Sequence, residues 1–302
     1  MRAYVQRNML AYSTGHRHAW SERLPMRKSA ATAAVSTECG FPNGAAELWT
    51  RGEISGGKDT MELSKRLQTV ASLVTDGYRL ADIGTDHAYI PISLTESGKI
   101  PGAVAMDVNR GPLLRARENI REHGQENKIS TRISDGFAGL ECGEVDSAVI
   151  AGMGGPLMIR LLKEGESVVG TLKECILQPQ SEIEKVRTFL LEEGFFFLKE
   201  EMVEEDGKYY SMMKVRPPSA AESGKDSCRL TKDWNETELR YGKLLLVGQH
   251  PVLREYLQRE IQIRLHILEG LEKAATEQAE RRRKELEREL KTAEKGMEYY
   301  AV

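Results

Sequence analysis

Apolar positions divide the chain into three stretches with different patterns. Between residues 61 and 218, segments with apolar residues at helical spacing alternate with short apolar runs, which predicts an α/β fold with a mostly parallel sheet. The first helix is expected over 61–74. The expected strands are Leu80–Ile83, Ala103–Asp107, Ile129–Ile133, Val145–Gly155, Glu174–Leu177, Phe195–Val203 and Lys208–Val215.

The last two predicted strands flank Glu205-Asp206-Gly207, a turn sequence typical of a β-hairpin. The first five strands are separated by helical segments and are therefore expected to run parallel. The predicted sheet is therefore parallel over five strands and ends in one antiparallel hairpin.

The stretch 219–302 reads as a polar linker followed by helices. Apolar residues recur at helical spacing from 253 to 271 and again from 286 to 297. Two such segments predict an antiparallel coiled-coil hairpin that turns near 274–280, with one long helix as the alternative. The densest basic cluster, Arg281–Lys284, is either a solvated helix face or a contact for RNA phosphates.

Residues 1–60 lack apolar periodicity and are expected to be disordered. An alternative is that they are not translated. The residues before Met61 (Gly56-Gly57-Lys58-Asp59-Thr60) can be encoded by a purine-rich, ribosome-binding sequence, which predicts a start at Met61. The predicted organisation is thus 1–60 as an extension, 61–218 as the α/β domain and 219–302 as a helical tail.

Composition limits the function classes. The net charge is −3 over 302 residues, so any contact with nucleic acid must come from local basic patches. There is no apolar run long enough to cross a membrane, and no membrane partner is expected. The four cysteines have no CxxC spacing, which favours free thiols in a reducing cytoplasm and predicts no metal site.

The strand at 80–83 leads into a glycine turn and a helix, the first β-turn-α unit of a nucleotide-binding fold. A dinucleotide fingerprint places glycine first, third and sixth, but here these positions hold Gly84, Asp86 and Tyr89. The Asp86 carboxylate would repel a pyrophosphate. The ligand S-adenosylmethionine (SAM) has no phosphate and carries two cationic groups, so it suits this turn better.

Two further acids follow the next strands. Asp107 ends the second strand 23 residues after Gly84, the spacing at which an acid meets ribose hydroxyls, or else it caps the following helix. Asp135, before Gly136, is placed to accept from an adenine amino group or to form a simple Asp-Gly turn.

The fourth strand ends in Gly152-Met-Gly-Gly155, whose small residues let a substrate ring approach the backbone. The fifth ends in Gln178-Pro-Gln180, and these two amides are candidates for hydrogen bonds to a base edge. Ser181 is expected to cap the next helix, with Glu184 completing a capping box.

Several of these stretches together resemble the bacterial tRNA (adenine-N1)-methyltransferase family that modifies adenosine 22 in the D-arm. The resemblance covers Met61 to the C-terminus. It rests on the segments 63–71 (LSKRLQTVA), 81–91 (ADIGTDHAYIP), 151–155 (AGMGG), 176–180 (ILQPQ) and 204–208 (EEDGK). It implies a Rossmann-like class I methyltransferase sheet with a coiled-coil tail, SAM as cofactor and tRNA as substrate.

The resemblance and the motif positions give three sets of predicted site residues. The catalytic candidates are Asp86, whose charge would stabilise the cationic product, and Tyr89, a wall for the base. The predicted cofactor-binding residues are Asp82, Gly84, Thr85, Asp86, His87, Asp107, Asp135, Gly136 and Gly152. The predicted substrate-binding residues are Lys65, Arg66, His87, Met153, Gly154, Gly155, Gln178, Gln180, Arg282 and Arg283.

His87 is expected either to contact a phosphate or to cap its helix. Other functions remain open at this point: a SAM-dependent methyltransferase acting on a small molecule or protein, or a non-catalytic RNA-binding protein. A monomer is expected, with a dimer through the coiled coil as the alternative.

Overall fold

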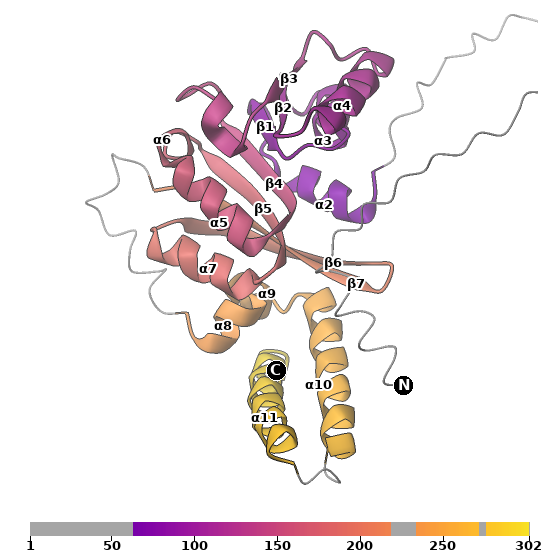
Figure 1. Ribbon diagram of the computed structural model, residues 1–302, viewed down its shortest axis with the longest axis vertical. Coiled ribbons are helices and arrows are strands. Elements are labelled where there is room, and N and C mark those ends of the chain that lie inside the picture. Colours follow the sequence, from indigo (N-terminus) through magenta and orange to yellow (C-terminus); the bar gives the residue numbers. More distant parts are fainter. Residues whose placement is uncertain (1–62, 219–233, 272–275, 302) are drawn as a thin grey trace, which may run out of the picture. The chain divides into compact units, whose positions relative to one another are not determined.

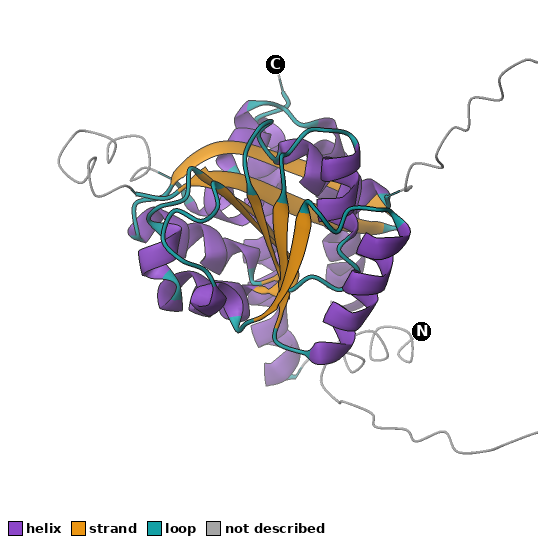
Figure 2. Ribbon diagram, turned by 90° about the horizontal axis from the view of Figure 1, so that it is seen from above, coloured by secondary structure: helices purple, strands orange, loops and turns teal. Residues whose placement is uncertain are grey.

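A seven-stranded sheet with helices on both faces forms the centre of the chain (Figures 1 and 2). The computed structural model describes residues 63–218, 234–271 and 276–301. The strand order is β3-β2-β1-β4-β5-β7-β6. Strands β1 to β5 run parallel to one another, and β7 is antiparallel to both of its neighbours, β5 and β6. The strands are β1 Leu80–Ile83, β2 Ala103–Asp107, β3 Ile129–Ile133, β4 Ser147–Gly154, β5 Glu174–Ser181, β6 Phe196–Glu205 and β7 Lys208–Arg216.

The helices cover both faces because the central strands are buried on both sides. One apolar core contains Met158 of α5 and Leu190 of α7, and the other contains Val70 of α2 and Ile92 of α3. The helices of this part are α2 Lys65–Leu73, α3 Tyr89–Glu96, α4 Arg110–Glu122, α5 Gly155–Glu164, α6 Glu166–Val169 and α7 Ile183–Glu192, with a 3-10 turn, η1, at Gly136–Gly139.

The strand order reverses at β1. Ile83 is paired with Met106 of β2 on one side and with Ile150 of β4 on the other. The carboxyl ends of these strands therefore meet at one edge of the sheet. In open α/β sheets a crevice for ligands forms at such a reversal, so a ligand site is expected at this edge.

The described part of the tail contains four helices: α8 Glu236–Tyr241, α9 Lys243–Val247, α10 Pro251–Leu271 and α11 Glu277–Glu298. The last two are antiparallel, because Arg264 pairs with Glu289 at 3.0 Å and Leu257 lies against Gly296. A cluster that includes Leu257 and Ala293 also contains Met202 of β6, so the tail packs on the edge strand. The expected hairpin is confirmed, although part of its turn lies outside the described residues.

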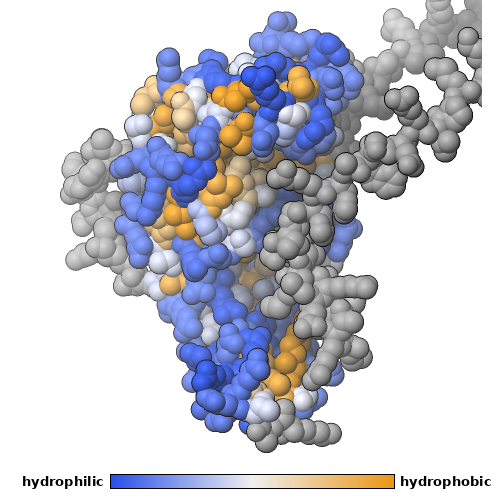
Figure 3. Space-filling view, in the orientation of Figure 1, coloured by the Kyte–Doolittle hydropathy of each residue, from blue (hydrophilic) through white to orange (hydrophobic). Residues whose placement is uncertain are grey.

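The outer surface of α10 and α11 is mostly hydrophilic in the view of Figure 3, with one apolar strip. The exposed large apolar residues of α10 are Ile263, Leu265 and Ile267. The remaining exposed positions of both helices are mainly charged, as expected for a solvated pair of helices.

The predicted fold class is confirmed, with two local corrections. The first helix begins at Lys65, where the Ser64 hydroxyl accepts from Leu67 N at 3.3 Å, rather than at Met61. Ser181 does not cap α7. It belongs to β5, and the helix follows Glu182, which adopts a left-handed φ of 50° without a side-chain cap. The reason is that β5 continues to pair with β4 as far as Ser181 and Gly154. The predictions for residues 1–60 and for the linker 219–225 lie outside the described residues.

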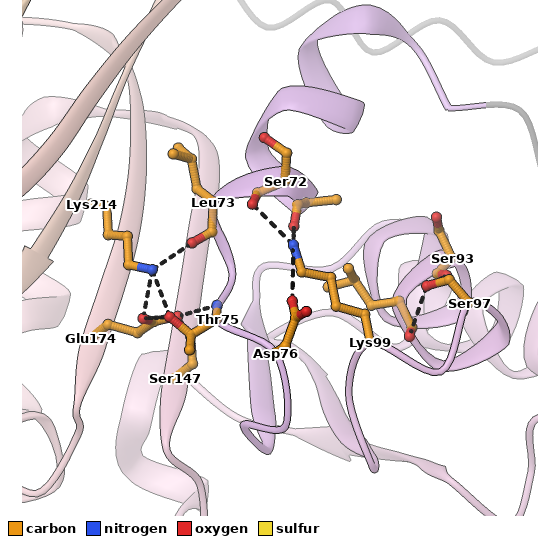
Figure 4. A network of polar contacts seen from close by, with 12 residues as sticks. Ser72, Leu73, Thr75, Asp76, Ser93, Ser97, Lys99, Ser147, Glu174 and Lys214 are labelled. Atoms are coloured by element: carbon orange, nitrogen blue, oxygen red, sulfur yellow. Dashed lines mark hydrogen bonds and ion pairs between the residues drawn. The ribbon is translucent and has the colours of Figure 1, made fainter.

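A buried polar network anchors the connection between α2 and β1 (Figure 4). The Glu174 carboxylate accepts from Thr75 N at 2.8 Å, from Ser147 Oγ at 3.1 Å and from Lys214 Nζ at 2.9 Å. Lys214 also donates to the carbonyl of Leu73 at 2.8 Å. These contacts tie the C-terminal end of α2 to β4, β5 and β7, so α2 is held firmly against the sheet.

Candidate cofactor and substrate site

The turn after β1 is built around a glycine that no other residue replaces without strain. Gly84 has φ of +77°, and a Cβ added there would overlap Met153 Cε. Its N–H and that of Thr85 both donate to the carbonyl of Met106 at 2.8 Å, which folds the turn onto β2. Thr85 is buried, and its hydroxyl accepts from Ala88 N at 3.1 Å.

Asp82 lies beneath this turn in β1 and is buried. Burial raises the pKa of Asp82 to about 6, against a smaller lowering by the Thr85 hydroxyl, and the charge of Asp107 raises it further. A carboxyl group in this position titrates near neutral pH and is sensitive to any charge brought close to the turn.

Asp107 and Asp135 follow the two neighbouring strands, as predicted. Asp107 does not cap α4: the cap position is Asn109, and Asp107 Oδ1 accepts from Asn109 N at 2.6 Å. Asp135 pairs with Arg160 of α5 at 3.1 Å. Arg160 was not among the predicted residues, and nothing in its local pattern marks it, because the contact spans 25 residues.

Gly136 is the second glycine that the site requires. Its φ is +57°, and a Cβ there would lie 2.7 Å from Leu161 Cδ2. The loop that carries Asp135 is therefore packed directly on α5.

The segment after Gly84 brings three predicted residues together. Asp86 Oδ1 accepts from Arg115 Nη2 at 2.5 Å, and Asp86 Oδ2 lies 3.2 Å from His87 Nε2. The rings of His87 and Tyr89 are stacked, with centroids 4.9 Å apart and planes inclined by 10°. His87 does not cap α3, whose cap residue is Ala88 with no side-chain hydrogen bond, so that alternative is wrong.

Tyr89 is 38% exposed, which leaves part of its ring free beside the turn. A flat exposed ring that is already stacked on a neighbour is a suitable surface for a nucleobase.

The glycine segment that ends β4 contains a bulge. The register between β4 and β5 shifts between Ala151 and Met153, and Gly152 adopts φ of +81°. Met153 then lies against Gly84, which joins this segment to the first turn. A Cβ at Gly155 would lie 2.6 Å from the carbonyl of Ser181, so the beginning of α5 approaches the end of β5 closely there.

The two glutamines of β5 have different surroundings. Gln178 is fully buried, and its Oε1 accepts from Gly152 N at 3.2 Å and from Arg66 Nη1 at 2.9 Å. Gln180 is exposed, with its amide nitrogen 3.7 Å from where a Gly152 Cβ would lie. Lys65, on the same helix as Arg66, donates to the carbonyl of Glu204 at 3.0 Å.

The tail arginines are paired within the helices. Arg282 forms an ion pair with Glu285 and lies 3.9 Å from Glu289, while Arg283 Nη2 donates to the carbonyl of Leu271 at 3.2 Å. Neither lies in the cluster formed by the turns of the sheet.

Within 63–218, 234–271 and 276–301, no group of three or more His, Cys, Asp or Glu side chains could hold a metal ion. Among the same residues, no helix has both the length and the apolar character needed to span a membrane.

The sequence matches the family described as "Methyltransferase domain" over residues 63–213. It is also 34% identical to the tRNA (adenine(22)-N(1))-methyltransferase of Bacillus subtilis over 227 residues, which are 75% of this chain and 93% of that protein. The chain belongs to the tRNA (adenine(22)-N(1))-methyltransferase family.

Solved structures of this family agree with the assignment. The Bacillus subtilis m1A22 tRNA methyltransferase has a TM-score of 0.65 and 32% identity, covering 78% of this chain and 99% of its own. A Streptococcus pneumoniae protein crystallised in complex with SAM has a TM-score of 0.66 and 32% identity, covering 78% and 100%. The family assignment supports neither of the two alternative functions.

Proposed function

We infer that the chain transfers a methyl group from SAM to N1 of adenine 22 in the D-arm of tRNA. The observation that carries this inference is the similarity to the Bacillus subtilis enzyme, which extends over 93% of that protein. The match to the methyltransferase domain over residues 63–213 includes every strand end of the site. The geometry of the strand ends supports it, because the turns after β1, β2, β3 and β4 meet at one edge of the sheet.

The residues at this edge fit SAM. The left-handed Gly84 turns the chain at the end of β1, and Asp107 offers a carboxylate at the end of the adjacent strand. We propose that Gly84, Thr85 and Asp107 hold the ribose and amino-acid parts, with Asp135 and Gly136 on the adenine side and Asp82 beneath the turn. When bound, SAM supplies an electrophilic methyl group on a sulfonium.

We propose that Asp86 and Tyr89 act on the target base. Adenine N1 carries an in-plane lone pair and needs no base to activate it, so positioning accounts for most of the rate. The methylated ring is cationic, and the Asp86 carboxylate, held by Arg115 and His87, stabilises that charge. The exposed ring of Tyr89 provides a stacking surface for an adenine turned out of the tRNA.

The basic residues around this edge provide a surface for the RNA backbone. Lys65 begins α2, Arg110 begins α4, and Arg115 of α4 pairs with Asp86 in the turn after β1. We propose that residues 61–218 carry catalysis and that the tail, with Arg282 and Arg283, contacts the body of the tRNA. The pairing of α10 with α11 inside one chain favours a monomer, and a tRNA substrate implies a cytoplasmic location.

The first experiment measures methyl transfer from labelled SAM to unmodified tRNA and maps the product nucleotide. The expected result is 1-methyladenosine at position 22, formed by the full chain and by a chain that starts at Met61. A control tRNA with guanosine at position 22 should not be labelled at that position. SAM binding without any tRNA methylation would contradict the proposal.

A further inference from the structure

Gln178 is a buried amide at the end of β5 whose polar atoms are used inside the protein. Its side chain is 0% exposed. Oε1 accepts from Arg66 Nη1 at 2.9 Å and from Gly152 N at 3.2 Å, and Nε2 donates to the carbonyl of Pro179 at 3.2 Å. An amide oxygen has two acceptor positions, so both are occupied.

The orientation of this amide follows from its neighbours. A flipped amide would place its NH₂ group against a guanidinium and a backbone N–H, which are both donors. Because Gln178 is closed off in this way, it does not present an amide edge to a base. Its contacts point instead to a role in holding other parts of the site.

The first of these parts is the bulge of β4. At Gly152 the ladder between β4 and β5 is interrupted, and the Gln178 side chain accepts the N–H that is left without a ladder partner. The residue after the bulge, Met153, lies on Gly84. The position of the Gly152–Gly155 segment relative to the first turn therefore depends on this hydrogen bond.

The second part is α2, which lies 112 residues away in sequence. Arg66 is half-buried, and its guanidinium lies over the Tyr210 ring at 5.6 Å from the centroid. Its backbone N–H donates to Glu205 Oε1 at 3.4 Å. Contacts of Glu174 and Lys214 fix the C-terminal end of α2. Arg66, on the same helix, is therefore held in place as a hydrogen-bond donor to Gln178.

We propose that Gln178 is a positioning residue. Supported by Arg66, it fixes the bulge at Gly152 and thereby the Gly152–Gly155 segment, which faces the target adenine. This assignment replaces the expectation that Gln178 reads a base edge, and it rests on the proposed methyl transfer. Positioning the base chiefly affects the chemical step, since a small misplacement of reacting atoms lowers the rate strongly.

The test compares Gln178→Met with Gln68→Met in the full chain. Gln68 is exposed on α2 and serves as a matched control for the same change of side chain. The expected result for Gln178→Met is a fall in kcat of about 30-fold, with the KM for tRNA and the Kd for SAM changed by less than about threefold. Gln68→Met should match the wild type in all three.

A second measurement does not depend on activity. Hydrogen–deuterium exchange in the peptide covering residues 150–156 should become faster in Gln178→Met and stay unchanged in Gln68→Met. Arg66→Met should lower kcat similarly, and the double variant with Gln178→Met should be little worse than either single variant, because both remove one unit.

Two results would overturn the assignment. One is a raised KM for tRNA with unchanged kcat and unchanged exchange, which would make Gln178 a direct substrate contact. The other is unchanged kcat and exchange together.

If Gln178→Met does not fold, Gln178→Glu is the second variant. It keeps an acceptor at Oε1 and should retain kcat within about fivefold, and a larger loss with intact SAM binding contradicts the role given to that atom. Wild-type activity tests the proposed function separately, and the exchange result stands even if the substrate assignment fails.

Discussion

Arg187 donates its Nε to Glu200 Oε1 at 2.8 Å in an ion pair whose two side chains are 1% and 0% exposed. Arg187 Nη1 donates to the carbonyls of Leu239 and Arg240 at 3.0 and 2.9 Å, and Glu200 Oε2 accepts from Leu244 N at 3.0 Å. Arg187 lies on α7 and Glu200 on β6, and together they hydrogen-bond backbone groups at the end of α8 and the beginning of α9. It therefore connects the sheet to the tail.

Breaking this pair should strongly destabilise the protein. Arg187→Met leaves Glu200 charged and buried without its partner, and we expect the free energy of unfolding to fall by about 3–5 kcal/mol. Denaturant titration measures the change. Arg281→Met, which removes an exposed pair with Glu277, should change it by less than about 0.5 kcal/mol. Equal effects of the two substitutions would contradict this prediction.

Gly84→Ala should weaken cofactor binding through a change in the packing of the turn as well as through backbone strain. The added Cβ would displace the end of the Met153 side chain, whereas at Gly98, which also has a positive φ of +70°, a Cβ meets nothing within 4 Å. Both alanine variants should lose about 1–2 kcal/mol of stability. We expect only Gly84→Ala to weaken the Kd for SAM, by at least about 30-fold, as measured by calorimetry. If Gly98→Ala weakens SAM binding equally, the turn is not the reason.

The buried Asp82 should make stability pH-dependent. Its pKa is about 6 in the folded protein, against an ordinary value of 3.8. Between these values the folded state holds a proton that the unfolded state releases, so the free energy of unfolding falls as pH rises, by about 3 kcal/mol in total. Asparagine does not titrate in this range, so the free energy of unfolding of Asp82→Asn should not fall in this way. Relative to the wild type, the stability of the variant should increase from pH 4 to pH 7.5. Parallel stability profiles of the two proteins would show that Asp82 does not titrate as stated.

Asp86→Ala should separate binding from catalysis. We expect kcat to fall by about 100-fold because a charge near the cationic product is lost. The Kd for SAM should change by less than about threefold. Asp76→Ala, which removes an exposed carboxylate at the opposite edge of the sheet, is the control. Near-normal turnover of Asp86→Ala would remove Asp86 from the catalytic residues.

Much of the fold follows from local sequence patterns. The bounds of β1, β2 and β3 follow directly from short apolar runs, and the hairpin of β6 and β7 follows from its Asp206-Gly207 turn, where both residues have positive φ. The predicted cap at Ser181 was wrong because strand pairing with β4 outcompeted a local capping preference. Local preferences are weak compared with a ladder that is already formed alongside.

The contacts that organise the site are mostly outside the reach of sequence patterns. Motifs at the strand ends predicted which glycines and acidic residues belong to the site, because the carboxyl ends of parallel strands lie at one edge of the sheet. The support of Gln178 by Arg66 and the pairing of Asp135 with Arg160 join residues 112 and 25 positions apart. No spacing rule links such residues, since their meeting depends on how whole elements pack.

The position of the tail also has a consequence for how copies of this protein behave in a crowded solution. β6 is one of the two edge strands of the sheet and is ten residues long, and α9 and α10 pack against it. A long, uncovered outer strand is a template on which other chains add by backbone pairing. By covering β6, the tail therefore hinders the pairing of this strand with strands of other chains. Chains that lose it are expected to aggregate before any defect in tRNA binding is measured.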